Sequence, residues 1–232
     1  MTVRPELLLL DIEGTIAPIS FVHDVLFPYA RDRLAGFVSA HAGEADIAAA
    51  LAELDTIAPG APPVATLLEL MDRDAKIGPL KLIQGRIWAE GFAAGELTGR
   101  LYPDVAPALR AWRAGGLRLA IYSSGSEEAQ RLLLRHTADG DLTGLFDQFF
   151  DTRVGGKRDA ASYAAIARAL GLAPAQVLFL SDVAAELAAA AAAGLKTTQI
   201  VRAEDQTIAS PDHPTAPDIA AVMASLGCSD LV

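Results

Sequence analysis

The stretch LLLLDIEGT at positions 7–15 decides the fold class of this chain. It begins with four consecutive leucines and continues with two acidic residues on either side of an isoleucine, then a glycine. An unbroken apolar run of this length is typical of a strand that is covered on both faces, as in a parallel sheet enclosed by helices. The polar residues that follow then lie at the carboxyl end of the strand, where open α/β sheets bind ligands.

Outward from this stretch, short apolar runs alternate with longer helical patterns. Strands are predicted at 117–122, 148–150, 177–180 and 197–201, and helices at 105–114, 127–135, 160–170 and 184–193. Strands and helices that alternate in this way form a parallel sheet with helices on both faces. The sequence therefore predicts a doubly wound α/β fold.

Residues 21–100 interrupt the alternation. They contain helical patterns at 24–40, 45–54, 64–74 and 80–94 and no good strand candidate. We interpret residues 21–100 as a helical cap, or lid, inserted after the first strand of a core that comprises residues 1–20 and 101–232. An insertion at this place would lie over the carboxyl ends of the strands. A separate helical domain with its own function is the alternative.

The composition limits location and partners. The formal net charge of −10 argues against non-specific nucleic-acid binding, which needs lysine and arginine to neutralise phosphates. One cysteine, Cys228, excludes an internal disulfide and suits a reducing compartment. No secretory signal is evident, and no apolar run approaches the roughly 20 residues of a membrane span. We expect a cytoplasmic monomer without membrane or nucleic-acid partners, in which only the stretch after Val201 is a candidate for disorder.

Asp11 and Glu13 form an acidic pair at the end of the first strand, followed by Gly14 on a tight turn. Residues two apart on a strand point to the same side. The pair could share a hard divalent cation, or could divide into a nucleophile and a proton donor. Taken alone the pattern is weak, because most acidic residues at strand ends are simply solvated.

Further chemistry-bearing residues follow the later strands. Ser123 and Ser124 lie where the second strand meets a helix, a place that favours anion binding, although N-capping by Ser124 or Ser126 is an equal alternative. Lys157 follows two glycines after the third strand, and Asp182 follows the fourth strand. Because the carboxyl ends of parallel strands meet at one edge, all these groups converge on one crevice. The joint pattern therefore favours a functional site over separate solvated residues.

This order of an aspartate, a hydroxyl, a lysine and an aspartate resembles the haloacid dehalogenase superfamily of phosphatases over nearly the whole chain. Within it, the chain resembles the enolase-phosphatases of methionine salvage, which have glutamate where most relatives have a second aspartate. The matching strings are DIEGT at 11–15, PISFV at 18–22, DVLFPYA at 24–30, QGRIW at 84–88, IYSSGS at 121–126 and LFLSD at 178–182.

The resemblance implies that Asp11 attacks phosphorus and forms an aspartyl-phosphate that water then hydrolyses. Glu13 would protonate the leaving oxygen and then deprotonate the water. One magnesium ion per subunit would be held by Asp11, Asp182 and the main-chain carbonyl of Glu13, with Glu186 nearby.

For the substrate, the resemblance implies that Ser123, Ser124 and Lys157 hold the phosphoryl oxygens of a small phosphorylated molecule. That molecule would be a diketo-methylthiopentyl phosphate, which is enolised and then dephosphorylated to an acireductone. Glu13 or polar residues of the lid are candidates for the enolisation base. We also hypothesise that the region from Gln84 to Trp88 sets specificity, with packing inside the lid as an equal alternative for Trp88.

Two other functions are consistent with parts of the pattern. The first is a phosphatase of other small phosphorylated metabolites on the same core. The second is a phospho-accepting signalling receiver, which also places carboxylates, a hydroxyl and a lysine around magnesium. A receiver is a single domain of about half this length and has no large helical insertion after its first strand.

Overall fold

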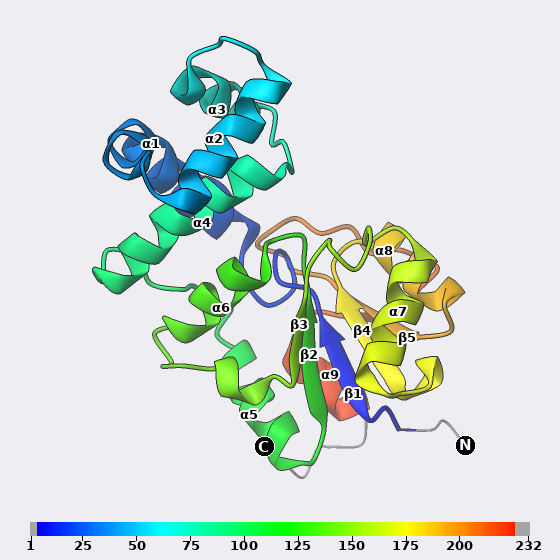
Figure 1. Ribbon diagram of the computed structural model, residues 1–232. Helices are drawn as coiled ribbons and strands as arrows, with labels where there is room; N and C mark the ends of the chain where they lie inside the picture. The colour runs from blue at the N-terminus through cyan, green and yellow to red at the C-terminus, as the bar shows by residue number, and fades with distance from the viewer. Residues whose placement is uncertain (1–3, 226–232) are drawn as a thin grey trace. The chain divides into compact units, whose positions relative to one another are not determined.

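The computed structural model describes residues 4–225 of the chain, and Cys228 lies outside them. Within this range, six parallel strands form one sheet in the order β3-β2-β1-β4-β5-β6. The strands are β1 (Leu7–Leu10), β2 (Arg118–Tyr122), β3 (Gln148–Phe150), β4 (Val177–Ser181), β5 (Lys196–Ile200) and β6 (Thr215–Ala216). The predicted parallel α/β sheet is confirmed (Figure 1).

The four leucines of β1 form the middle of the sheet. Leu7 pairs with Arg118 of β2 on one side and with Val177 of β4 on the other, and all four leucines are fully buried. Burying one such side chain stabilises a fold by roughly 1.5–3 kcal/mol. This central position explains why β1 is apolar at every residue rather than at alternate ones.

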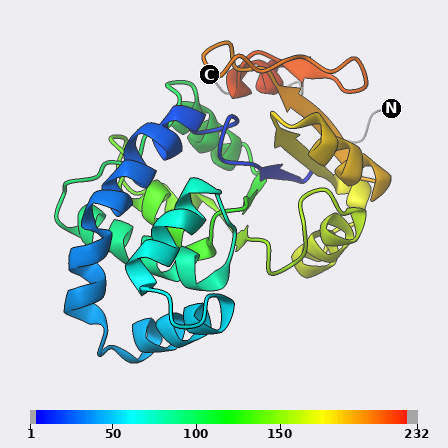
Figure 2. The same ribbon diagram turned by 90° about the horizontal axis from the view of Figure 1, so that it is seen from above.

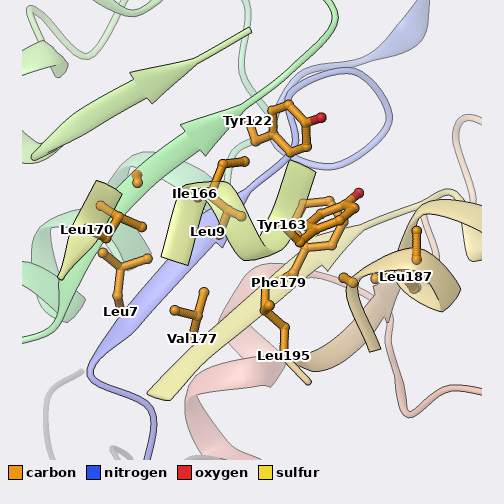
Figure 3. Packing of buried hydrophobic residues seen from close by; sticks show 13 residues of the cluster. Leu7, Leu9, Tyr122, Tyr163, Ile166, Leu170, Val177, Phe179, Leu187 and Leu195 are labelled. Carbon is orange, nitrogen blue, oxygen red and sulfur yellow. The ribbon is translucent and has the colours of Figure 1, made fainter. Parts of the chain in front are cut away.

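Helices cover both faces of the sheet. On one face, helices α7 (Ala160–Leu170) and α8 (Ala184–Ala192) pack on the strands, and Figure 3 shows Tyr163 and Ile166 of α7 against Leu9 and Phe179. Helices α5 (Val105–Ala114), α6 (Glu127–Arg135) and α9 (Ile219–Ser225) lie on the other side of the sheet (Figure 1). The sheet is therefore the middle layer of three.

The strand order determines where a ligand can bind. From β1 the chain first builds the sheet toward β2 and β3, and then continues on the other side with β4, β5 and β6. In doubly wound sheets, ligands bind at the carboxyl ends of the strands where this direction changes. In this chain the change lies between β1 and β4, directly beside Asp11 and Asp182.

The chain divides into two compact units, Met1–Ile19 with Gly99–Val232, and Ser20–Thr98. The second unit is helical throughout, and none of residues 20–98 lies in a strand (blue to teal in Figure 2). Its helices have a core of their own, which includes Leu34, Ile47 and Ile83. Its elements are a π-helical segment Phe21–Leu26 and the helices α1 (Phe27–His41), α2 (Ala45–Ile57), α3 (Pro63–Asp72) and α4 (Gly78–Ala93).

The stretch after Val201, the one candidate for disorder, contains regular structure within its described residues 202–225. Strand β6 extends the sheet there by pairing with β5, and α9 contacts α5. Two residues of strand and a short helix carry too weak a pattern to be recognised before their packing partners are known. Among the described residues, no helix combines the length and the apolar character needed to cross a membrane.

Candidate active site

Asp11 is fixed immediately after β1. Its main-chain N–H donates to Leu180 O at 2.9 Å and so extends the pairing with β4 by one residue. The residue is buried, and its carboxylate accepts hydrogen bonds from the Ile12 N–H (2.8 Å), the Ser181 hydroxyl (3.0 Å) and the Lys157 ammonium (2.6 Å). These donors hold the Asp11 side chain in one orientation.

Gly14 allows the turn that follows. Its φ of +74° lies in the left-handed region, and a Cβ at this position would come within 2.5 Å of the Asp182 carboxylate. The loop after β1 therefore packs directly against the end of β4, as only glycine permits.

Glu13 is partly buried on the same loop. Its Oε2 accepts a hydrogen bond from the Ser123 hydroxyl at 3.0 Å. Burial is the largest effect on Glu13 and, together with the charge of Asp11, raises its pKa, while Lys157 acts in the opposite direction. A carboxyl group whose protonated form is favoured in this way can act as a proton donor.

Ser123 and Ser124 follow β2, at the N-terminus of α6. Ser123 is fully buried, donates to Glu13 and accepts from the Gly125 N–H at 3.1 Å. The N-cap of α6 is Ser126, whose hydroxyl accepts from the Ala129 N–H. Of the two candidates for N-capping, Ser126 therefore has this role, and Ser124 does not.

Lys157 reaches Asp11 from the loop after β3. Three hydroxyls bind consecutive carbonyls of this loop: Tyr122 binds Gly155 O (2.9 Å), Ser162 binds Gly156 O (2.9 Å) and Tyr163 binds Lys157 O (2.7 Å). The loop backbone is thus fixed from β2 and α7. None of these three hydroxyls is recognisable as part of the site from the sequence.

The Lys157 ammonium bridges two carboxylates, Asp11 at 2.6 Å and Glu186 at 2.7 Å. Burial lowers the pKa of Lys157, but the charges of Asp11 and Glu186 outweigh it, so the pKa is raised and the side chain stays charged. The Ser181 hydroxyl lies between the same two carboxylates, 3.0 Å from Asp11 Oδ2 and 3.1 Å from Glu186 Oε2. Glu186, expected near a metal, thus contacts the lysine, and Ser181 is a residue of the site that was not predicted from the sequence.

Asp182 directly follows β4, the strand that neighbours β1 and Asp11. Its N–H donates to the Thr15 hydroxyl at 3.0 Å. Burial, and after it the negative charge of Asp11, raise the pKa of Asp182 to about 7. Burial and Asp11 likewise raise the pKa of Glu186 to about 7. Negative charge is therefore in excess here, with Lys157 as the cation that contacts Asp11.

This excess fits a cation. Among residues 4–225, no group of three or more His, Cys, Asp or Glu side chains is arranged to hold a metal ion. A magnesium ion usually takes only one or two carboxylates and keeps several waters, so Asp11 and Asp182 at adjacent strand ends suit it. Both groups supply the hard oxygen atoms that such an ion prefers.

Two buried glutamines bind main-chain carbonyls of the loops that carry the site residues, and neither glutamine was predicted to have this role. Gln130 of α6 donates to Gly125 O (2.8 Å) and Phe150 O (2.9 Å). Gln199 of β5 donates to Asp182 O (2.8 Å) and accepts from the Ser210 N–H (2.7 Å). The β-branched neighbours of Gln199 in β5 are the only signal that the sequence offers for it, and Gln130, among the charged residues at the start of α6, has no such signal.

The region from Gln84 to Trp88 is bound inside the helical unit. Arg86 forms ion pairs with Glu44 (2.5 Å) and Asp46 (2.6 Å). The Trp88 indole donates to Leu26 O at 2.8 Å, and its ring stacks on Phe27. These contacts favour the structural interpretation of Trp88, and a specificity role for the region stays a prediction.

Comparison with known proteins agrees with this geometry. The family model of the haloacid dehalogenase-like hydrolases matches residues 5–194. The enolase-phosphatase E1 of Acidiphilium cryptum is 79% identical over 99% of both chains, and that of Gluconacetobacter diazotrophicus is 57% identical over 90% of this chain and 88% of the relative.

Solved structures agree as well. The UTR4 protein of Saccharomyces cerevisiae is similar with a TM-score of 0.77 and 33% identity over 92% of this chain and 98% of that one. CbbY from Rhodobacter sphaeroides, at 19% identity and a TM-score of 0.64 over 96% of this chain and 99% of that one, shares the fold. The chain therefore belongs to the haloacid dehalogenase-like hydrolases and, within them, to the enolase-phosphatase E1 family.

Proposed function

We propose that this chain is an enolase-phosphatase of methionine salvage, which converts 2,3-diketo-5-methylthiopentyl-1-phosphate into acireductone (1,2-dihydroxy-3-keto-5-methylthiopentene) and phosphate. The names of its full-length relatives support this substrate over other phosphorylated metabolites and over a signalling receiver. One observation carries the phosphatase chemistry: the Asp11 carboxylate is buried and bound by Lys157 and Ser181, with Glu13 two residues away.

In the first step, an oxygen of Asp11 forms a bond to phosphorus while the bond from phosphorus to the leaving oxygen breaks. Glu13 gives its proton to that leaving oxygen. In the second step, water attacks the phosphorus of the aspartyl-phosphate, its proton goes to Glu13, and Asp11 is released as a carboxylate. The two carboxyl groups thus return to their starting protonation states.

Ser123, Ser124 and Lys157 bind the phosphoryl oxygens in this proposal. Lys157 lies 2.6 Å from Asp11, so its charge is next to the attacking carboxylate and offsets the negative charge of the phosphoryl oxygens that meet it there. Ser123 contacts Glu13 as well, and so holds the proton donor next to the phosphoryl group. Removing one such donor from an active site typically costs about 10²–10³-fold in kcat.

We propose that the metal is one magnesium ion per subunit. Asp11, Asp182 and the main-chain carbonyl of Glu13 would hold it, since the Glu13 side chain is engaged with Ser123. When bound, the ion neutralises the charge that otherwise repels a carboxylate nucleophile from a phosphate. Removal of the ion by a chelator is expected to abolish phosphate release and to leave the fold intact.

Enolisation precedes phosphate transfer in this scheme. It needs a base next to an acidified carbon, and we propose Glu13 or a polar residue of the helical segment 21–100 for this role. We propose that segment 21–100 is the lid of a core that comprises residues 1–20 and 101–232. We further propose a cytoplasmic monomer, which light scattering of the purified protein would test.

A coupled assay tests the function as a whole. Purified protein is mixed with the diketo phosphate, and phosphate and acireductone absorbance are followed with and without magnesium. We expect metal-dependent appearance of both products in equal amounts. Phosphate release from other phosphomonoesters, and none from this substrate, would reject the assignment to methionine salvage but would keep the phosphatase chemistry.

A further inference from the structure

Arg202 is a buried arginine outside every motif of the site. It lies just after β5, at the start of the loop that leads to β6, and is 6% exposed. Its guanidinium contacts two parts of the chain at once: the Asp104 carboxylate at the N-terminus of α5, and the main-chain carbonyl of Thr15 in the loop after β1.

The guanidinium binds both partners in a forked geometry. Nη1 and Nη2 donate to the two oxygens of Asp104 at 2.8 and 3.1 Å, while Nε and Nη2 donate to Thr15 O at 3.2 and 2.8 Å. Its Cζ lies 4.0 Å from the centre of the Tyr102 ring. Asp104 is itself held by the Ile219 N–H at 2.9 Å. A lysine ammonium carries the same charge but cannot reproduce this planar fork.

Thr15 connects Arg202 to the site. It is fully buried, and its hydroxyl accepts the Asp182 N–H at 3.0 Å. The same hydroxyl lies 3.5 Å from Asp182 Oδ1. The residue thus has its carbonyl bound to Arg202 and its hydroxyl bound to Asp182, so a movement of one end changes the position of the other.

We propose that Arg202 is a positioning residue that acts through Thr15 to hold Asp182 in place relative to Asp11. The proposal rests on the function proposed above, because it makes Arg202 necessary for the geometry of the site that would bind magnesium. A side chain that acts indirectly on a metal ligand typically changes affinity or activity by about 10–100-fold.

Arg202→Lys tests the proposal, with Arg110→Lys as the matched control. Arg110 also donates to a main-chain carbonyl, Asp139 O at 2.6 Å, but on the exposed surface. For Arg202→Lys we expect kcat to fall about 10–100-fold, KM to change little, and the dissociation constant for Mg²⁺, measured by calorimetry, to rise about 10-fold. Arg110→Lys is expected to leave all three unchanged.

A double-mutant cycle separates positioning from general destabilisation. In a Thr15→Val background the path to Asp182 is already broken, so Arg202→Lys is expected to have little further effect on Mg²⁺ binding. Wild-type Mg²⁺ affinity and kcat in Arg202→Lys would overturn the proposal, as would equal losses in both backgrounds. If Arg202→Lys does not fold, Asp104→Asn tests the same proposal, because it weakens the ion pair that orients the Arg202 guanidinium toward Thr15. The same losses of kcat and Mg²⁺ affinity are then expected.

The outcomes also distinguish this proposal from the function on which it rests. If the wild-type chain binds Mg²⁺ but releases no phosphate from the diketo substrate, the substrate assignment fails, and the calorimetric comparison still decides the role of Arg202. A wild-type chain without measurable Mg²⁺ binding would overturn the positioning role itself.

Discussion

Both compact units contain a cation that bridges two carboxylates, and the two arrangements differ in burial. In the core unit, Lys157 bridges Asp11 and Glu186, and the three side chains are 9%, 3% and 12% exposed. In the helical unit, Arg86 bridges Glu44 and Asp46, at 29%, 44% and 43% exposure. The N–O distances are nearly equal, at 2.6 and 2.7 Å in the core and 2.5 and 2.6 Å in the helical unit.

Burial, and not distance, determines what each cluster contributes. Water screens an exposed pair, which typically contributes up to about 1 kcal/mol. A buried pair has a large desolvation penalty, so removing one partner leaves an uncompensated charge at a cost of about 3–5 kcal/mol. Loss of Lys157 is therefore expected to cost more stability than loss of Arg86, whose ion pairs link one end of α2 to α4.

Replacing Lys157 is expected to have the largest effect on both stability and activity. Lys157→Met leaves Asp11 and Glu186 buried without their cation, so we expect the free energy of unfolding to fall by about 3–5 kcal/mol. We also expect kcat to fall by about 10²–10³-fold, because the charge next to the reacting oxygen is lost. Urea unfolding and steady-state kinetics measure the two effects. A stable and active variant would contradict the assigned role of the cluster.

Substitutions at two glycines, one in each unit, are expected to change stability in opposite directions. Gly14→Ala forces a side chain into the left-handed region, 2.5 Å from the Asp182 carboxylate. We expect a loss of about 1–3 kcal/mol of stability, together with a loss of activity, because Asp182 must move. Gly36→Ala in α1 has open space around the added Cβ, so we expect a gain of up to about 1 kcal/mol. Thermal unfolding of both variants would disprove this if the two shifts had the same sign.

Replacing Arg86 is expected to have the smallest effect. Arg86→Ala removes two partly exposed ion pairs, so the loss of stability should stay below about 1 kcal/mol and shrink further in high salt. A larger loss that salt does not reduce would show that exposure is not what separates the two clusters. The KM of the same variant for the diketo phosphate tests the specificity hypothesis for this region, which an unchanged KM and turnover would refute.

The parallel sheet could be predicted because its signal is local. The four leucines of β1 and the helical patterns after each strand follow directly from burial and periodicity. The parallel topology then brings Asp11, Asp182 and Lys157 to one edge of the sheet. A residue directly after a strand, such as Asp11 or Asp182, can be placed at this edge from the sequence, because strand direction determines its position.

The supporting residues could not be predicted, because their roles depend on tertiary contacts. Gln130, Gln199 and Arg202 each donate to a main-chain carbonyl of a site loop. Every residue has such a carbonyl, so the sequence does not show which one a side chain will bind. The contact between Glu186 and Lys157 joins α8 to the loop after β3 and was missed for the same reason. Strand β6 is two residues long and forms only against β5.

The buried carboxylate of Asp11 is the nucleophile in the proposed mechanism. The most direct measurement is mass spectrometry of the peptide that contains Asp11, after a single turnover with the diketo phosphate is quenched in acid. We expect one phosphoryl group on Asp11 in the wild-type chain, and neither the adduct nor phosphate release in Asp11→Asn. Phosphate release without a phosphorylated Asp11, or continued turnover by Asp11→Asn, would contradict it.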